Sequence, residues 1–162
     1  MTEPAAAGRR ITIPIHLRWG DLDAYGHVNN ATLLELLQEA RVRAFWRRAS
    51  AGAPETAVID AEPGSDSLTL IARQEIEYLL PIPYLVEPIT VDMWLTKLGG
   101  SSIEVAYEVR SPESDDEDLL YARAATVIVF IDAATQRPRR LGAVEREAWG
   151  SYLGEPIGFR RS

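Results

Sequence analysis

Cysteine is absent from the 162-residue chain, which excludes disulfide bonds, cysteine zinc sites and a cysteine nucleophile. Histidine occurs only twice, as His16 and His27, which is too few for a histidine-rich metal site. Lysine is almost missing as well, because Lys97 is the only one and arginine carries nearly all of the positive charge. These counts argue against a metal site built from cysteine or from several histidines.

Positive charge is also in the minority, since 17 basic residues face 24 acidic ones and the formal net charge is −7. Such a chain is repelled by nucleic acid and by anionic membranes, so we expect neither as a partner. The longest apolar run, residues 127–131, has the length of a strand and is too short to span a membrane. Residues 1–9 lack the apolar core of a signal peptide, so we expect a disordered tail on a cytoplasmic protein.

Apolar periodicity predicts one α+β domain over residues 1–162. A stripe at Leu33, Leu37, Ala40 and Ala44 predicts a helix over residues 30–49, ended by Gly52 and Pro54. Alternating apolar and polar residues predict strands over residues 11–19, 68–80, 89–98, 101–110 and 119–131, the last of them central because it is apolar on both faces. We also expect a hairpin at Gly99-Gly100 and a short helix over residues 144–152.

Common catalytic motifs are missing from the sequence, which has no P-loop, no G-x-G-x-x-G, no G-x-S-x-G and no H-E-x-x-H. The stretch that stands out is residues 18–31, Arg-Trp-Gly-Asp-Leu-Asp-Ala-Tyr-Gly-His-Val-Asn-Asn-Ala. It leads from a predicted strand into a predicted helix that Asn29 or Asn30 can cap. The first turn of a helix leaves backbone N–H groups unpaired and carries partial positive charge, so it can hold an oxyanion. With Asp23 and His27 in the same loop, the stretch favours attack on a carbonyl group.

Every residue of the motif also has a purely structural interpretation. Asp21 and Asp23 could accept hydrogen bonds from loop N–H groups, and Gly26 could be a turn glycine. His27 could be an ordinary loop histidine, and the two asparagines could be helix caps only. Glu35 and Glu39 on the helix are more often solvated than catalytic, given their arginine neighbours.

Residues 21–31, Asp-Leu-Asp-Ala-Tyr-Gly-His-Val-Asn-Asn-Ala, resemble the signature of hotdog-fold acyl thioesterases. They are similar to the 4-hydroxybenzoyl-CoA thioesterase group and to plant-type acyl-ACP thioesterases. The resemblance implies a long central helix wrapped by a curled antiparallel sheet of about five strands. It also implies a homodimer or homotetramer, with a second subunit covering the other face and the edge of the sheet and with active sites at the subunit interface.

The resemblance further implies hydrolysis of an acyl-CoA or acyl carrier protein thioester to a carboxylic acid and a free thiol. Because a thioester is already an activated acyl group, we expect this reaction to need no cofactor and no metal ion. It places the catalytic acid at Asp23, as general base or as nucleophile, and a functional histidine at His27. We expect the N–H near Asn30 to polarise the thioester carbonyl, and Tyr25, Gly26 and Asn29 to contact the substrate. Tyr25 stands where the acyl-ACP branch often has asparagine.

Two other functions fit the same fold, namely an acyl-CoA-binding module without catalysis and a hydratase acting on enoyl thioesters. The sequence also leaves undecided which residues outside the motif contact the substrate. The phosphates of coenzyme A would need arginines, and the candidates are Arg73, Arg110, Arg137, Arg139 and Arg140. The aromatic residues that shape a pocket or simply fill the core are Tyr78, Tyr84, Trp94 and Tyr107.

Overall fold

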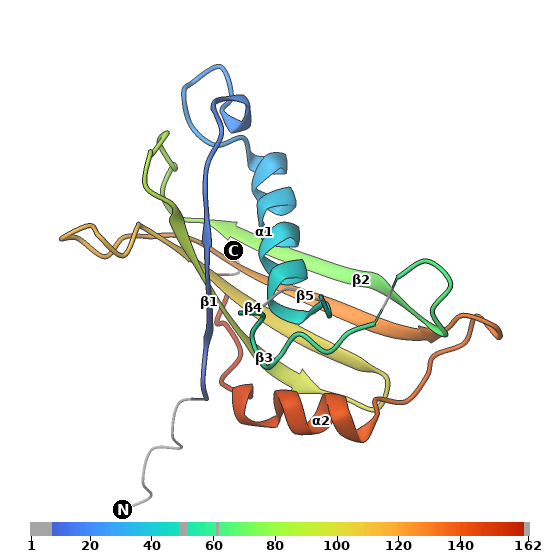
Figure 1. Cartoon of the computed structure of the whole chain (residues 1–162). Helices are drawn as coiled ribbons and strands as arrows, with labels where there is room; N and C mark the ends of the chain where they lie inside the picture. Colours follow the sequence, from blue (N-terminus) through green and yellow to red (C-terminus); the bar gives the residue numbers. More distant parts are fainter. Residues whose placement is uncertain (1–7, 49–51, 61, 161–162) are drawn as a thin grey trace, which may run out of the picture.

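A computed structural model of the protein describes residues 8–48, 52–60 and 62–160, and its centre is a five-stranded sheet (Figure 1). The strands are β1 (Ile11–Ile15), β2 (Ser67–Tyr78), β3 (Ile89–Leu98), β4 (Ser102–Arg110) and β5 (Leu120–Asp132). Their order is β1-β3-β4-β5-β2, and every neighbouring pair is antiparallel. All five predicted strands are therefore present, with the first shorter than predicted.

The order of the strands explains two features of the sequence. Pro14 lies in the edge strand β1 opposite Thr90, a position where the missing N–H of proline costs no central ladder bond. β5, apolar on both faces, is an inner strand as predicted, but the middle position belongs to β4. Along β5, buried side chains alternate with half-buried ones, which fits a strand whose two faces both carry apolar residues.

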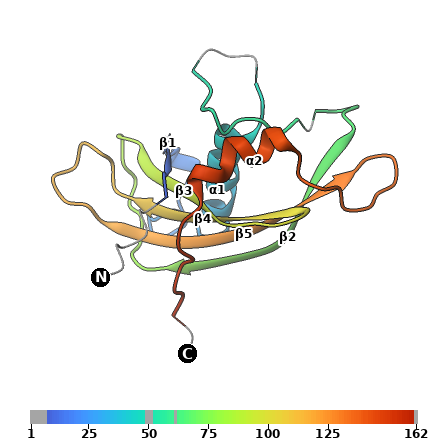
Figure 2. The same ribbon diagram turned by 90° about the horizontal axis from the view of Figure 1, so that it is seen from below.

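Helix α1 (Asn30–Phe45) packs across the inner face of the sheet and buries Leu33, Leu37, Ala40 and Ala44, the predicted stripe. Figure 2 shows α1 and the short helix α2 (Ala143–Trp149) on the same side of the curled sheet. A long helix wrapped by a curled antiparallel sheet is the hotdog arrangement, and this prediction is confirmed. No helix in the described ranges is long and apolar enough to cross a membrane.

The prediction that α1 continues to residue 49 and is ended by Gly52 and Pro54 is wrong. The helix ends at Phe45 because the chain pairs with Ile59: the Ile59 N–H donates to the Phe45 carbonyl, and the Arg47 N–H donates to the Ile59 carbonyl. A backbone pairing with a distant segment thus overrides local helix propensity.

The outer face of the sheet is covered in part by the chain's own C-terminal segment, residues 153–160. The Gly154 N–H donates to the Leu95 carbonyl at 2.8 Å, and the Trp94 indole N–H donates to the Glu155 carbonyl at 2.9 Å. Farther along, the Arg160 N–H donates to a Glu77 carboxylate oxygen at 2.7 Å. We expected a second subunit to cover this face of the sheet. The C-terminal segment of the same chain already covers part of it. At the other end, Gly8 and Arg9 of the expected tail are placed, and residues 1–7 lie outside the described residues.

The link between α2 and the sheet is a partly buried ion pair, and it yields a pH-dependent prediction. Glu145 accepts two hydrogen bonds from the Arg139 guanidinium, at 2.7 and 2.8 Å, and one from the Gly142 N–H at 2.8 Å. Burial raises the pKa of the Glu145 carboxyl, but these hydrogen bonds and the arginine charge lower it by more, so the net pKa is depressed. A depressed carboxyl pKa adds stability that is present at neutral pH and lost as the pH falls through the folded-state value.

Glu145→Gln should therefore lower the free energy of unfolding by about 2 kcal/mol at pH 7, because Arg139 loses its charged partner. The difference from wild type should shrink when the pH is lowered below the ordinary range of a glutamate. Urea denaturation at several pH values measures both effects. Glu147→Gln, on the exposed side of the same helix, is the matched control and should be neutral. An equal loss at pH 7 and at pH 3 would contradict the assigned role of the ion pair.

The candidate active site

Asp21 closes the loop that carries the motif. Its buried carboxylate accepts hydrogen bonds from the Arg18 backbone N–H at 2.7 Å and from the Arg18 guanidinium at 2.9 Å. Its own carbonyl accepts the N–H of Asn29 at 2.9 Å. Both ends of the loop are thus joined through Asp21, which faces the protein interior.

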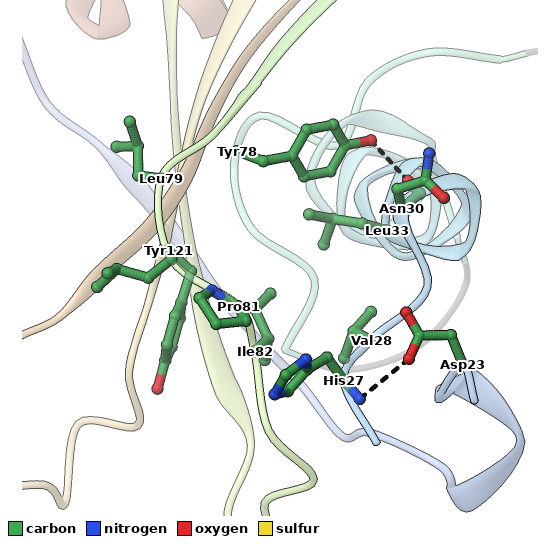
Figure 3. A pocket seen from close by; sticks show the side chains of 11 residues that line it. Asp23, His27, Val28, Asn30, Leu33, Tyr78, Leu79, Pro81, Ile82 and Tyr121 are labelled. Carbon is green, nitrogen blue, oxygen red and sulfur yellow. Dashed lines mark hydrogen bonds between the residues drawn. The ribbon is translucent and has the colours of Figure 1, made fainter. Parts of the chain in front are cut away.

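Asp23 organises a tight turn and keeps one oxygen free. Its Oδ1 accepts the N–H of Tyr25 at 2.8 Å and that of His27 at 3.3 Å, and its own N–H donates to the His27 carbonyl. Gly26 has φ +79°, a left-handed conformation that glycine adopts without strain, and it closes the turn. Oδ2 of Asp23 makes no hydrogen bond to any residue that the structure describes (Figure 3).

The start of α1 leaves one backbone donor unpaired. Asn29 is the cap: its side-chain oxygen accepts the N–H groups of Ala31 and Thr32, and its carbonyl accepts that of Leu33. The Asn29 N–H donates to Asp21. Only Asn30, of residues 29–32, has an N–H without an acceptor among the described residues. This donor lies at the positive end of the helix dipole, where an oxyanion is stabilised.

Asp23, His27 and Asn30 line the same cavity of about 450 Å³ (Figure 3). Apolar groups form most of its wall; the other lining residues are Val28, Leu33, Tyr78, Leu79, Leu80, Pro81, Ile82 and Tyr121. The loop after β2 is held against the motif, because the Val28 N–H donates to the Ile82 carbonyl at 2.9 Å. The arrangement is a mainly apolar cavity, and two residues that line it, Asp23 and Asn30, keep a carboxylate oxygen and a backbone N–H without a partner among the described residues.

The two tyrosines of the cavity are neutral groups. The Tyr78 hydroxyl donates to the Asn30 carbonyl at 2.7 Å, which fixes the end of β2 to the first turn of α1. Burial raises the pKa of the Tyr78 and Tyr121 hydroxyls, so both remain protonated at neutral pH. They supply shape and hydrogen bonding without charge.

The residues predicted to contact substrate lie apart from this wall. Tyr25 is 86 % exposed at the tip of the turn, and Gly26 shapes the turn. The side chain of Asn29 is engaged in capping. The cavity wall therefore contains Asp23, His27 and Asn30 of the six predicted residues.

Residues 17–148 match the model of the thioesterase-like superfamily. The chain belongs to this superfamily. No sequence among the curated proteins matches it.

Solved structures share the fold over nearly the whole chain. A thioesterase from Thermus thermophilus, solved with coenzyme A and zinc, is 29 % identical, with a TM-score of 0.64 over 90 % of this chain and 96 % of that one. A candidate acyl-CoA thioesterase from Xanthomonas campestris is 28 % identical, with a TM-score of 0.61 over 81 % and 98 %. The PA5185 protein of Pseudomonas aeruginosa is 22 % identical, with a TM-score of 0.70 over 89 % and 92 %, and shows the fold alone.

Several residues singled out in this thioesterase-like chain lie away from the cavity. Arg73, Arg110 and Arg139 form ion pairs with neighbouring carboxylates. Tyr107 is in the core, where its hydroxyl accepts a hydrogen bond from Arg41. The helix carboxylates Glu35 and Glu39 line a separate cavity beside β1. In the described part of the chain, no three histidine, aspartate or glutamate side chains gather closely enough to hold a metal ion.

Most of the apolar cavity wall is not identifiable from the motif. The prolines Pro81 and Pro83 mark a break after β2, which is the signal that could have singled out the loop of residues 79–82. No local sequence feature distinguishes Tyr121, because most of its neighbours in β5 are also apolar. It joins the site only through the pairing of β5 with β2.

Proposed function

We propose that the protein hydrolyses acyl-CoA thioesters, with Asp23 as the catalytic carboxylate. The observation that carries this proposal is that one cavity is lined both by Asp23, whose Oδ2 has no partner among the described residues, and by Asn30, whose N–H has none there either. Hydrolysis of a thioester needs both: a group that attacks or activates water, and a donor for the oxygen that becomes negative. Membership in the thioesterase-like superfamily and the solved relative with coenzyme A support the choice of substrate.

In the proposed reaction the thioester carbonyl oxygen accepts the Asn30 N–H, and the positive end of α1 strengthens this contact. Asp23 Oδ2 either takes a proton from water as that water attacks the carbonyl carbon, or attacks the carbon itself. In the first route the carbon–sulfur bond then breaks, and the leaving thiolate takes from Asp23 the proton that came from water. In the second route the carbon–sulfur bond breaks as the mixed anhydride of Asp23 forms, and water then hydrolyses the anhydride and supplies the proton that the thiolate takes. Both routes give a carboxylic acid and a free thiol.

We assign His27 the task of orienting the carbonyl or the water. Its backbone N–H and carbonyl are both bonded to Asp23, which holds the residue at the cavity wall. Its imidazole makes no hydrogen bond to any described residue, so both ring nitrogens are available to substrate or water. The thioester is already an activated acyl group, so the proposed reaction requires no cofactor.

A panel of thioesters tests the proposal, with release of free thiol as the readout. It should span short, long and aromatic acyl groups on coenzyme A, together with acyl carrier protein thioesters. Thiol release identifies a hydrolase and its acyl preference. Saturable binding without release would favour the acyl-CoA-binding module, and hydration of an enoyl thioester would favour the hydratase.

The site is proposed to work in a homodimer or a larger homo-oligomer. β2 pairs with β5 only, and its other edge has no partner strand in the described ranges. Leu70 and Ile71 on this strand are 57 % and 41 % exposed, which is unusual for apolar residues in the middle of a long strand. An exposed edge of this kind is suited to pairing with the same edge of a second copy.

Light scattering at micromolar concentration should therefore give a mass of at least twice the 18.0 kDa of one chain. The mass should persist on dilution through the low micromolar range, because strand pairing and the apolar side chains of β2 act together. A single species of 18.0 kDa across that range would contradict the proposed dimer.

A further inference from the structure

Trp19 is a large apolar side chain that the fold leaves in solvent. It is 76 % exposed, whereas Trp94 and Trp149 are buried and Trp46 is half-buried. Its ring meets that of Tyr84, itself 40 % exposed, at 5.5 Å between centroids and an interplanar angle of 73°. We call these two side chains the aromatic ledge. Edge contact with a single tyrosine leaves most of the indole surface free for a ligand.

The aromatic ledge is held in place from both sides. Trp19 begins a 3-10 turn, Trp19–Asp21, in which the Leu22 N–H donates to the Trp19 carbonyl and the buried Asp21 is bound by Arg18. Tyr84 follows Pro83, whose backbone bridges that of His27. A ligand therefore meets a surface that is already ordered, which lowers the entropy lost on binding.

The two residues of the ledge belong to chain segments that also supply the cavity wall. Trp19 is four residues before Asp23, so the reach of the chain limits the distance between their Cα atoms to about 14 Å. Figure 1 shows the blue stretch between β1 and α1, which includes the turn Trp19–Asp21, looping beyond the N-terminal end of α1. Tyr84 comes two residues after Ile82, which is part of the cavity wall. Short stretches of chain thus join both side chains of the ledge to residues that line the cavity.

We propose that the aromatic ledge stacks the adenine ring of coenzyme A, an inference that rests on the proposed function. With the acyl group in the cavity and the thioester at Asp23, the pantetheine arm leads out of the mouth and adenine must bind outside. Aromatic side chains stack purine rings without needing positive charge, which this chain of net charge −7 has little of. The Arg18 side chain, 78 % exposed beside Trp19, adds a cation within reach of the phosphates.

Binding is tested first on the intact protein, because Trp19 is the most exposed of its four tryptophans and serves as its own reporter. Titration with coenzyme A should quench the tryptophan emission to saturation, while pantetheine, which has the same arm without adenine, should not. Trp19→Leu should abolish the quenching. Val86→Ala is the matched control: Val86 is 79 % exposed on the loop of Tyr84, and its loss should leave the quenching intact.

Kinetics then separate this inference from the proposed function. Trp19→Leu should raise the KM for an acyl-CoA about tenfold, with kcat unchanged, since stacking a base is a ground-state contact outside the reacting atoms. The KM for the same acyl group on N-acetylcysteamine, which lacks adenine, should not change. The inference would be overturned if Trp19→Leu raised the KM of both substrates equally. It would also be overturned if the tryptophan emission changed on dilution of the protein but not on addition of coenzyme A. If no thioester reacted, the proposed function would be wrong. The quenching of tryptophan emission by coenzyme A would still show whether the ledge binds adenine.

Discussion

Asp23→Asn should lower kcat for the best thioester substrate by at least about a hundredfold. At this position the substitution changes one carboxylate oxygen and keeps the hydrogen bonds of the other. The asparagine Oδ1 can still accept the N–H groups of Tyr25 and His27, so the turn keeps its hydrogen bonds. Only Oδ2, which is free in the cavity, is replaced by an amide NH₂ that can neither take a proton nor attack the carbonyl carbon.

Folding and substrate binding should survive in the same variant. Thermal denaturation should give a midpoint close to wild type, and the KM or the coenzyme A affinity should change little. Rate loss with intact folding and binding is the signature of a group that acts in the transition state. A variant that hydrolyses thioesters at close to the wild-type rate would remove Asp23 from the mechanism.

Asp21→Asn is the matched control, since it makes the same chemical change two residues away. Asp21 is fully buried and uses both carboxylate oxygens on Arg18, so the amide NH₂ leaves one of these buried hydrogen bonds without an acceptor. We expect a loss of about 2 kcal/mol in the free energy of unfolding and little loss of kcat below the melting temperature. If Asp21→Asn were inactive but folded and Asp23→Asn active, the two roles would be reversed.

Trp149→Ala should have the largest effect on stability, about 4 kcal/mol in the free energy of unfolding. Trp149 is completely buried, with its ring 6.0 Å from that of Phe45 and 5.9 Å from that of Phe130. Its indole N–H donates to the buried carbonyl of Thr56. The substitution therefore leaves a cavity between α1, β5 and α2 and an unpaired carbonyl as well.

Urea denaturation measures this loss, and Val144→Ala on the same helix is the control. Val144 is 61 % exposed, so its truncation should change the free energy of unfolding by less than about 0.5 kcal/mol. A cost below about 1 kcal/mol for Trp149→Ala would mean that α2 does not contribute to the core as the packing indicates.

Parts of the fold with a strong local pattern were predictable. The bounds of β3 are those expected from alternation alone, and α1 begins where the asparagines indicated. The end of α1 was not predictable, because residues 46–49 have acceptable helix propensity. What ends the helix is a hydrogen-bonded pairing with Ile59, which no local pattern encodes. The crossing of residues 153–160 over the outer face was missed for the same reason.

By itself, the sequence determined the chemistry available to this protein: no thiol, no histidine cluster, and one loop that places an acid and a histidine before a helix N-terminus. These are properties of residue type and short spacing, which act within a few bonds of the backbone. The tertiary structure alone decided which groups are free. Both aspartates precede the helix, yet the buried contacts of Asp21 with Arg18 occupy its carboxylate and leave Asp23 an open oxygen. The apolar wall, with Tyr121 from β5 beside Ile82, exists only because strands distant in sequence pair, and strand pairing is governed by long-range packing that a local pattern does not contain.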